Sequence, residues 1–291
     1  MPTAWFKDQF HDFESAFETQ LEQIQAPQRL KEAILYSTLN GGKRLRALLT
    51  LASGELCGAN KQTLYPIAGA IECIHAYSLI HDDLPAMDDD NFRRGKPTCH
   101  KAFDEATAIL AGDALLTYSF ELLSHLPALS AEKKLQIIQL YSTAAGTVGM
   151  VGGQFIDLES EDKTITLQEL ETIHRKKTGA LIKCAILAGA IAGNTDQDTY
   201  DKLSTYADNI GLAFQIKDDI LDVTGTQEEL GKMPGSDLLQ DKSTYISLLG
   251  MDSSVEKLNR LTTDAIELLA SFGKKAEPLI DLAHYIQKRN H

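Results

Sequence analysis

The chain has few cysteines, and they do not form pairs. Its four cysteines are Cys57, Cys73, Cys99 and Cys184, which stand far apart in 291 residues. There is no CxxC pair and no short secreted cysteine framework, which argues against a disulfide-stapled protein. We therefore expect reduced thiols in a cytoplasmic protein.

A long hydrophobic run is also missing. The longest, from Cys184 to Gly193, covers ten residues and is too short to cross a bilayer. Residues 1–17 carry acidic and polar side chains where a signal peptide needs an unbroken apolar core. No linker rich in proline, serine and glycine interrupts the pattern. We expect one domain over residues 1–291, with no membrane span and no export signal.

Basic residues are in deficit. The 28 Lys and Arg residues face 41 Asp and Glu residues, which gives a net charge of -13. Nucleic-acid-binding domains present a basic patch or stripe, so nucleic acid is not expected as a partner. An anionic small substrate remains compatible, because the local field depends on nearby cations and metal ions rather than on the sum.

Convincing strand signals are absent as well, and apolar residues recur at helical spacing nearly everywhere. The expected fold class is all-α. Thr166 to Glu169 and Ser253 to Glu256 have the spacing of capping boxes at helix starts. The pattern predicts helices over residues 5–24, 27–40, 43–56, 64–83, 106–126, 131–157, 166–193, 199–223, from 253 onwards, and 277–288.

What the sequence does contain is two clusters of carboxylates, each at the end of an apolar helix. Magnesium prefers oxygen ligands and is commonly held by one or two carboxylates together with substrate phosphates. One isolated acidic run is more often a solvated helix end, but two matching clusters followed by basic residues favour a metal site. The clusters supply Asp82, Asp83, Asp88, Asp218, Asp219 and Asp222.

The first cluster has an awkward spacing that a proline resolves. Asp88 lies six positions after Asp82 and would face away from it on a continuous helix. Pro85 lacks an N–H and would clash with the carbonyl of His81, so the helix cannot continue. A turn beginning near Leu84 is expected to bring Asp88 back towards Asp82.

Several basic residues could bind phosphate. Lys43, Arg44 and Arg46 open a helix, where positive charge opposes the helix dipole unless an anion is present. Arg93 and Arg94 follow the first cluster and suit bidentate phosphate binding. For each of these, a solvated surface side chain is the simpler alternative.

Three further sites extend this cationic set. His75 lies two helical turns before Asp82, on roughly the same face. A basic band from His174 to Gly179 interrupts an otherwise apolar helix. Lys232 and Lys242 lie in a stretch with glycine and proline that could close over phosphates as a lid.

These motifs together resemble those of the trans-isoprenyl diphosphate synthases. The resemblance covers almost the whole chain and rests on GGKRLR at residues 41–46, on ECIHAYSLIHDDLPAMD at residues 72–88, and on FQIKDDILD at residues 214–222. It implies a helical bundle around a deep cavity, with the acid motifs facing each other at its mouth, and a homodimer. Ala47 departs from the family pattern, which has proline there, and this change could alter how its helix begins.

The resemblance also implies roles for single residues. Direct Mg²⁺ ligands would be Asp82, Asp88 and Asp218. Asp83, Asp219 and Asp222 would occupy supporting positions in the metal site. Three Mg²⁺ ions would be bound when substrate is present. The isopentenyl diphosphate site would comprise Lys43, Arg46, His75 and Arg94. The allylic diphosphate site would comprise Arg93, Lys177, Thr178, Gln215 and Lys232, with Lys242 as an addition, and Lys177 and Lys232 would act in catalysis.

The implied reaction is a Mg²⁺-dependent condensation of isopentenyl diphosphate with dimethylallyl or geranyl diphosphate. Ionisation of the allylic diphosphate would be followed by attack of the isopentenyl double bond and loss of a proton, for which the resemblance implies the released pyrophosphate as acceptor. A large side chain about one turn below Asp82 would act as a floor for the growing tail. Tyr77 and Ser78 occupy that level, and Tyr77 predicts a fifteen-carbon farnesyl product unless it merely packs.

Three alternatives remain open. A geranylgeranyl-chain synthase would share every motif and differ only in product length. A terpene cyclase usually has a single DDxxD motif and no GGKR, which this sequence disfavours. A non-catalytic regulatory subunit would be expected to have lost acid-motif carboxylates, whereas all six are present.

Overall fold

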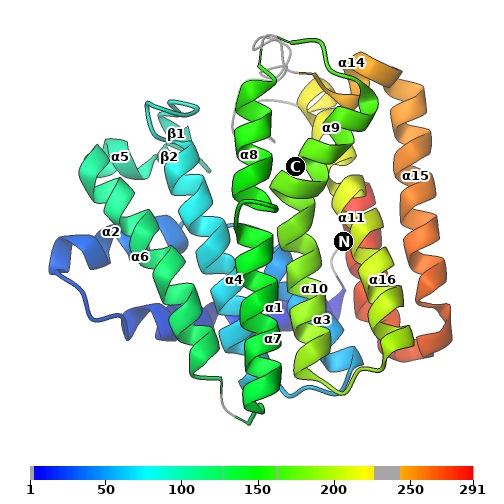
Figure 1. Ribbon diagram of the computed structural model, residues 1–291, viewed down its shortest axis with the longest axis horizontal. Helices are drawn as coiled ribbons and strands as arrows, with labels where there is room; N and C mark the ends of the chain where they lie inside the picture. The colour runs from blue at the N-terminus through cyan, green and yellow to red at the C-terminus, as the bar shows by residue number, and fades with distance from the viewer. Residues whose placement is uncertain (1–2, 127, 162, 226–242, 291) are drawn as a thin grey trace.

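Long helices stand side by side in the computed structural model, which describes residues 3–126, 128–161, 163–225 and 243–290 (Figure 1). Two short strands, β1 (Phe92–Arg93) and β2 (Lys96–Pro97), pair antiparallel in a small hairpin. The all-α fold class predicted from the sequence is confirmed. In chain order the helical elements are α1 (Ala4–Glu22), α2 (Gln28–Thr38), α3 (Leu45–Leu56), α4 (Lys61–Asp82), α5 (Cys99–Ala102), α6 (Glu105–Ser124), α7 (Ala131–Ala145), α8 (Met150–Glu159), α9 (Leu167–His174), a π-helical segment η1 (Arg175–Gly179), α10 (Ala180–Ala192), α11 (Gln197–Thr224), α14 (Tyr245–Leu249), α15 (Met251–Leu268), a 3-10 segment η2 (Ala270–Ala276) and α16 (Glu277–Lys288).

Helices α3, α4 and α10 form the centre of the bundle. α4 packs against α3 and α6, and α10 packs against α3, α7 and α11. Both α4 and α10 are buried on most sides, which explains why their sequences lack a polar face. This packing fixes the C-terminal end of α4, where the first acid cluster begins.

The helix predicted over residues 131–157 is two helices, so that prediction was wrong. α7 ends at Ala145 and α8 begins at Met150 after a turn that contains Gly146 and Gly149. A side chain at Gly149 would collide with the carbonyl oxygen of Ala144, so the turn needs glycine. The break turns the chain before α8, which forms one wall of the cavity described below.

The helix predicted from Thr166 to Gly193 exists but contains a π-helical turn, η1, in its middle. Its predicted capping box is confirmed, because Thr166 and Glu169 bond each other's backbone N–H groups. By contrast, the cap predicted at Ser253 was wrong, since α15 already begins at Met251 after Gly250, whose φ is 79°. π-Helical turns often mark functional sites, and η1 carries Lys177 and Thr178.

By length and composition alone, α6 could cross a membrane. The core helix of a soluble protein meets the same criterion. The inner face of α6, with Ala108, Ala111 and Leu115 fully buried, packs against α4. Its outer face carries the exposed side chains of Ile109 and Leu110.

Candidate active site

The turn after α4 brings two carboxylates of the first acid cluster together. The backbone N–H of Asp88 donates to the carbonyl oxygen of Asp82 at 2.9 Å, so the chain folds back at Pro85 as expected. Burial, followed by repulsion from Asp88 and Asp83, raises the pKa of Asp82 to about 6, although Lys177 and Arg93 act against the shift. An additional cation at this position would stabilise the ionised form of Asp82.

Asp83 points to a different partner. Arg93 Nε donates to Asp83 Oδ1 at 2.8 Å and to Oδ2 at 3.0 Å, and Arg93 Nη2 donates to Oδ1 at 2.5 Å. Asp83 is only 3% exposed. A carboxylate held by such a bidentate pair is a poor direct metal ligand, and this agrees with the supporting position that the resemblance implied.

Lys177 lies on η1 and points towards the first cluster. Its ammonium group donates to Asp157 of α8 at 2.7 Å, and attraction from Asp157, Asp82 and Asp88 raises its pKa despite burial. Gly153, one turn before Asp157, allows α8 to pack directly on the backbone of η1, because a Cβ there would collide with the backbone nitrogen of Lys177. The position of Lys177 therefore depends on α8.

The second cluster is linked to η1 by a chain of hydrogen bonds. Thr178 Oγ1 donates to Gln215 Oε1 at 3.1 Å, and Gln215 Nε2 donates to Asp219 Oδ1 at 3.5 Å. The other Asp219 oxygen accepts the backbone N–H of Tyr245 at 2.8 Å. Both oxygens of Asp219 thus bind protein groups, while Asp222 is buried nearby on the same helix.

Asp218 pairs with a residue that sequence reasoning did not select. Arg289, just after α16, donates from Nη2 to Asp218 Oδ1 at 2.5 Å and to the Phe214 carbonyl oxygen at 3.1 Å. Its guanidinium lies 4.2 Å from the centre of the Phe214 ring. The C-terminal end of the described chain therefore supplies a positively charged side chain to the second cluster.

A separate group of cations lies close to Asp218. Burial lowers the pKa of Lys43 to about 8, and repulsion from Arg289 and Arg94 adds to the shift. Burial also lowers the pKa of Arg46, whose Nε is buried without a hydrogen-bond partner. Burial and the nearby arginines lower the pKa of His75 well below its usual value, so this imidazole is neutral near pH 7. An anion would relieve the repulsion within this group.

Arg94 belongs to the same group. It adopts a left-handed backbone conformation with φ 53°, and its guanidinium donates to the Gly41 carbonyl oxygen. The guanidinium lies over Gly42, where a Cβ would be 2.9 Å from Arg94 Cζ. The two glycines of the GGKR motif therefore let Arg94 approach the backbone beside Lys43.

Arg44 turns away from the other two cations of its motif. It is 5% exposed and pairs with Glu14 and with Glu72, whose Oε2 is 3.4 Å from Arg44 Nη1. Glu72 Oε1 accepts the backbone N–H of Ala47 at 3.1 Å. The family's proline could not make this last bond, so at Ala47 the helix start is fixed by a side chain of α4 instead.

A cavity of about 420 Å³ is lined by some of these residues. At one end it is lined by Arg46, His75, Asp82, Lys177 and Thr178. Its walls come from α4, α8 and α10 and are largely apolar, including Met150, Val151, Phe155, Leu158 and Leu181. Tyr77 and Ser78 line it below Asp82, at the level predicted for a floor.

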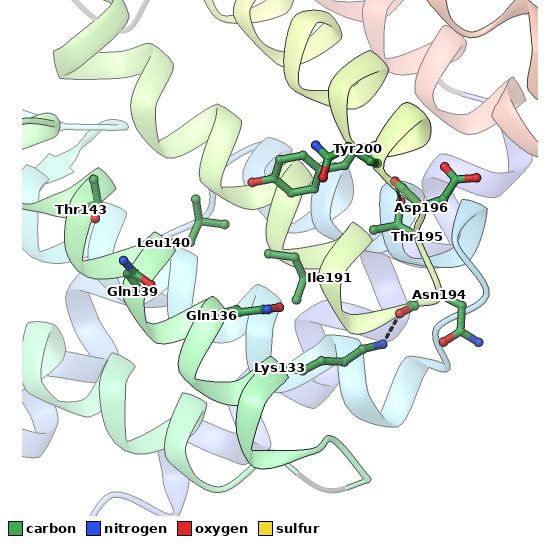
Figure 2. A pocket seen from close by; sticks show the side chains of 12 residues that line it. Lys133, Gln136, Gln139, Leu140, Thr143, Ile191, Asn194, Thr195, Asp196 and Tyr200 are labelled. Carbon is green, nitrogen blue, oxygen red and sulfur yellow. Dashed lines mark hydrogen bonds between the residues drawn. The ribbon is translucent and has the colours of Figure 1, made fainter.

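A larger cavity, of about 840 Å³, lies at the opposite end of the bundle (Figure 2). Its walls carry amide side chains such as Gln136, Gln139 and Asn194, and Lys133 donates to the backbone oxygen of Gly193. Asp196 at this end and Asp218 are separated along α11 by about 33 Å, at 1.5 Å per residue. This cavity contains neither acid cluster, so we place the reaction in the smaller one.

Comparison with known proteins agrees with this arrangement. A family model described as polyprenyl synthetase matches residues 27–275. The chain belongs to the polyprenyl synthetase family. It is 54% identical over 251 residues to farnesyl diphosphate synthase of Haemophilus influenzae, covering 86% of this chain and 84% of that protein. It is 45% identical over 291 residues to farnesyl diphosphate synthase of Bacillus subtilis, covering 99% and 98%.

A solved structure is also similar to this polyprenyl synthetase. It is a putative farnesyl-diphosphate synthase from Marinomonas sp. MED121, 44% identical, with a TM-score of 0.85 and coverage of 99% of this chain and 100% of that one. The family resemblance inferred from the motifs is therefore confirmed.

The carboxylates of this polyprenyl synthetase fit magnesium only if other ligands join them. Within the described ranges, no three His, Cys, Asp or Glu side chains lie close enough together to hold a metal ion by themselves. Asp82 and Asp88 place carboxylate oxygens near Lys177, and Asp218 places another beside Arg289, where such oxygens could serve as ligands. Such a partial oxygen shell suits Mg²⁺, which keeps waters and takes substrate phosphate oxygens.

Most predicted site residues meet at this end of the bundle. Lys232 and Lys242 lie outside the described residues. Sequence reasoning missed Asp157 and Arg289 as functional residues. Asp157 could have been found as the acid one turn after Gly153, whereas Arg289 sits in a short basic stretch after α16 that gives no sign of its partner.

Proposed function

We propose that this polyprenyl synthetase is a Mg²⁺-dependent farnesyl diphosphate synthase that condenses isopentenyl diphosphate with dimethylallyl or geranyl diphosphate. The single observation that carries the proposal is the apolar cavity that starts at Asp82 and Lys177 and runs down to Tyr77. A diphosphate head fits the charged end, and a prenyl tail fits the apolar walls.

Two diphosphates need two separate sets of cations. Lys177 and Thr178 line the cavity beside Asp82, Arg93 lies close enough to Asp82 to oppose the rise in its pKa, and Gln215 accepts a hydrogen bond from Thr178. These four residues would bind the allylic diphosphate. Lys43, Arg46, Arg94 and the neutral His75 would bind isopentenyl diphosphate, and the crowding of positive charge there favours an anion. Lys232 and Lys242 are proposed to complete the allylic site.

The ligands proposed for magnesium are Asp82, Asp88 and Asp218, with Asp83, Asp219 and Asp222 in support and three ions bound in the substrate complex. Bound magnesium would neutralise charge on the departing diphosphate. Lys177, held by Asp157, adds a fixed positive charge at the same place, and preorganised charge of this kind lowers the barrier to charge separation. The two diphosphate sites hold the isopentenyl double bond against the allylic carbon. The apolar walls exclude water that would capture the cation.

Tyr77 supports a fifteen-carbon product. It is 6% exposed, lines the cavity and lies five residues, about 7.5 Å along α4, before Asp82. A geranylgeranyl product would require space where this ring lies. Synthesis of geranylgeranyl diphosphate is the second candidate function, because only this level of the cavity distinguishes the two products.

The deciding experiment is one incubation of the purified protein with Mg²⁺, isopentenyl diphosphate and geranyl diphosphate, analysed by mass spectrometry. Farnesyl diphosphate as the main product supports the proposal. A twenty-carbon product would favour the second candidate, and the absence of any condensation product would refute both.

We also propose that the protein acts as a cytoplasmic homodimer. Helices α6, α7 and α8 adjoin one another and share an apolar outer surface, as expected for a protein interface. A second copy that covers this surface would also account for the apolar character of α6 without a membrane. Sedimentation of the wild type and of Leu110→Asp tests the proposed dimer. The wild type should be dimeric and the variant should dissociate, whereas a monomeric wild type would contradict the proposal. On these three helices and the turn between α7 and α8, the exposed apolar residues are Ile109, Leu110, Leu135, Val148, Val151 and Phe155, of which Val151 and Phe155 also line the cavity of about 420 Å³.

A further inference from the structure

The ring of Tyr77 is supported by the ring of His81. The two residues are one helical turn apart on α4, and their ring centres are 5.8 Å apart at an angle of 76°. Edge-to-face packing of this kind restricts how a ring can turn. Both rings line the cavity of about 420 Å³.

His81 is in turn held by α6. Its Nε2 lies 3.1 Å from the carbonyl oxygen of Ile109. A carbonyl oxygen only accepts, so Nε2 carries the hydrogen and donates. The ring also lies directly against Gly112, where a Cβ would overlap His81 Nε2 and its neighbouring carbons. The hydrogen bond to Ile109 and the space left by Gly112 both lie at the Nε2 edge of the ring, so together they seat the imidazole of α4 against α6.

We propose that His81, seated on Ile109 and Gly112 of α6, is a specificity-determining residue that sets product length by holding the Tyr77 ring across the cavity. This inference rests on the proposed prenyltransferase function. The floor is then made by two helices, because α4 supplies the ring and α6 fixes its orientation.

The direction of the effect follows from the packing. Removing the imidazole leaves space beside Tyr77 into which the phenol ring can turn, since a cavity made by truncation is filled by its neighbours or by a ligand. The floor then lies lower, and a tail one isoprene unit longer can fit. A hydrophobic pocket discriminates between tails of different length by the space that it leaves for them. The ratio of twenty-carbon to fifteen-carbon product should therefore rise about tenfold in His81→Ala.

The test compares products of wild type, His81→Ala, Tyr77→Ala and the double variant Tyr77→Ala/His81→Ala by mass spectrometry, with excess isopentenyl diphosphate. If His81 acts through Tyr77, His81→Ala raises the ratio of twenty-carbon to fifteen-carbon product in the wild-type background. The same substitution should not change the ratio further when residue 77 is already alanine. The matched control is His125→Ala, just after α6. The exposed ring of His125 lies within hydrogen-bond distance of Ser124 Oγ and the Glu121 carbonyl oxygen, so its removal should leave the ratio unchanged. Because the measurement is a ratio of two products from the same sample, it does not depend on how much of each variant is active.

His81→Gln provides a second variant should His81→Ala fail to fold. It keeps an amide donor for Ile109 but has no ring edge against Tyr77, so a rise in the ratio is again expected. A wild-type ratio in whichever variant folds would overturn the inference while leaving the proposed function intact. A wild type that forms no prenyl product would instead overturn the proposed function.

Discussion

Arg289 and Asp218, 71 residues apart in the chain, form an ion pair with 2.5 Å between Arg289 Nη2 and Asp218 Oδ1. The guanidinium offsets the negative charge of Asp218, and it adds to the effect of burial in lowering the pKa of Lys43. The C-terminal end of the described chain therefore contributes to the electrostatics of both proposed diphosphate sites.

A pH profile tests this contribution. Lys43 carries its positive charge below its pKa of about 8, so its attraction for a diphosphate weakens as the pH rises through that value. Removing a neighbouring positive charge raises a lysine pKa. Arg289→Ala should therefore move the alkaline rise in KM for isopentenyl diphosphate to higher pH. The control is Lys288→Ala, which removes an exposed charge one residue away and should leave the profile in place. If KM for isopentenyl diphosphate rose at the same alkaline pH in Arg289→Ala as in wild type, the proposed effect of Arg289 on Lys43 would be contradicted.

The acid clusters should be required for turnover but not for folding. Asp82→Ala and Asp218→Ala are each expected to lower kcat by at least about a hundredfold, the scale of losing one preorganised transition-state contact. The melting temperature of Asp82→Ala should remain close to that of wild type, because Asp82 is an ionisable group held in an unfavourable buried setting. Asp218→Ala should still fold but melt at a lower temperature, because it leaves the buried Arg289 without its carboxylate partner. Asp113→Ala on the exposed face of α6 is the matched control. Near-normal rates in either cluster variant would rule out its metal-binding role.

Tyr77→Ala is expected to lengthen the product. Truncating the phenol removes the side chain that lines the cavity one to two turns below Asp82. Mass spectrometry should then find a twenty-carbon product in place of most of the fifteen-carbon one. Tyr200→Ala, the same truncation in the larger cavity at the opposite end of the bundle, serves as the control. An unchanged product would show that the floor lies elsewhere.

The Lys177–Asp157 pair should matter more for rate than for binding. Asp157→Asn replaces the charged partner 2.7 Å from the ammonium with a neutral amide, so Lys177 is held less firmly near Asp82. We expect kcat to fall about tenfold with a smaller change in KM, since a displaced charge stabilises the transition state less well. Steady-state kinetics decides this. The comparison variant is Asp208→Asn, which breaks the similar but remote pair with Lys183, also 2.7 Å, and should leave kcat intact.

Glu72 is expected to stabilise the fold. It is 4% exposed and binds both Arg44 and the N–H of Ala47. Glu72→Ala leaves the buried Arg44 with only Glu14, and breaking a buried pair costs about 3 kcal/mol in the free energy of unfolding. Urea denaturation measures the loss. The exposed Lys61–Asp12 pair provides the contrast, because Asp12→Ala should cost less than about 1 kcal/mol.

Much of the molecule could be predicted from local patterns in the chain. Helical periodicity gave the all-α class, because a helix buries one face and its sequence must repeat at 3.6 residues. The turn at Pro85 and the return of Asp88 to Asp82 also followed, since proline acts on its immediate neighbours. The break between α7 and α8 did not follow, because the apolar spacing on both sides fits one helix and only packing distinguishes the two.

What the sequence determined by itself was therefore the set of helices, the carboxylates at their ends and the kind of chemistry that those groups suit. The tertiary structure decided which charges meet. It paired Asp83 with Arg93, Asp218 with Arg289, Lys177 with Asp157, and Arg44 with Glu72, and it placed His81 of α4 on α6. Those pairings depend on how helices far apart in the sequence pack against one another, and the sequence of a single helix contains no information about its distant partner.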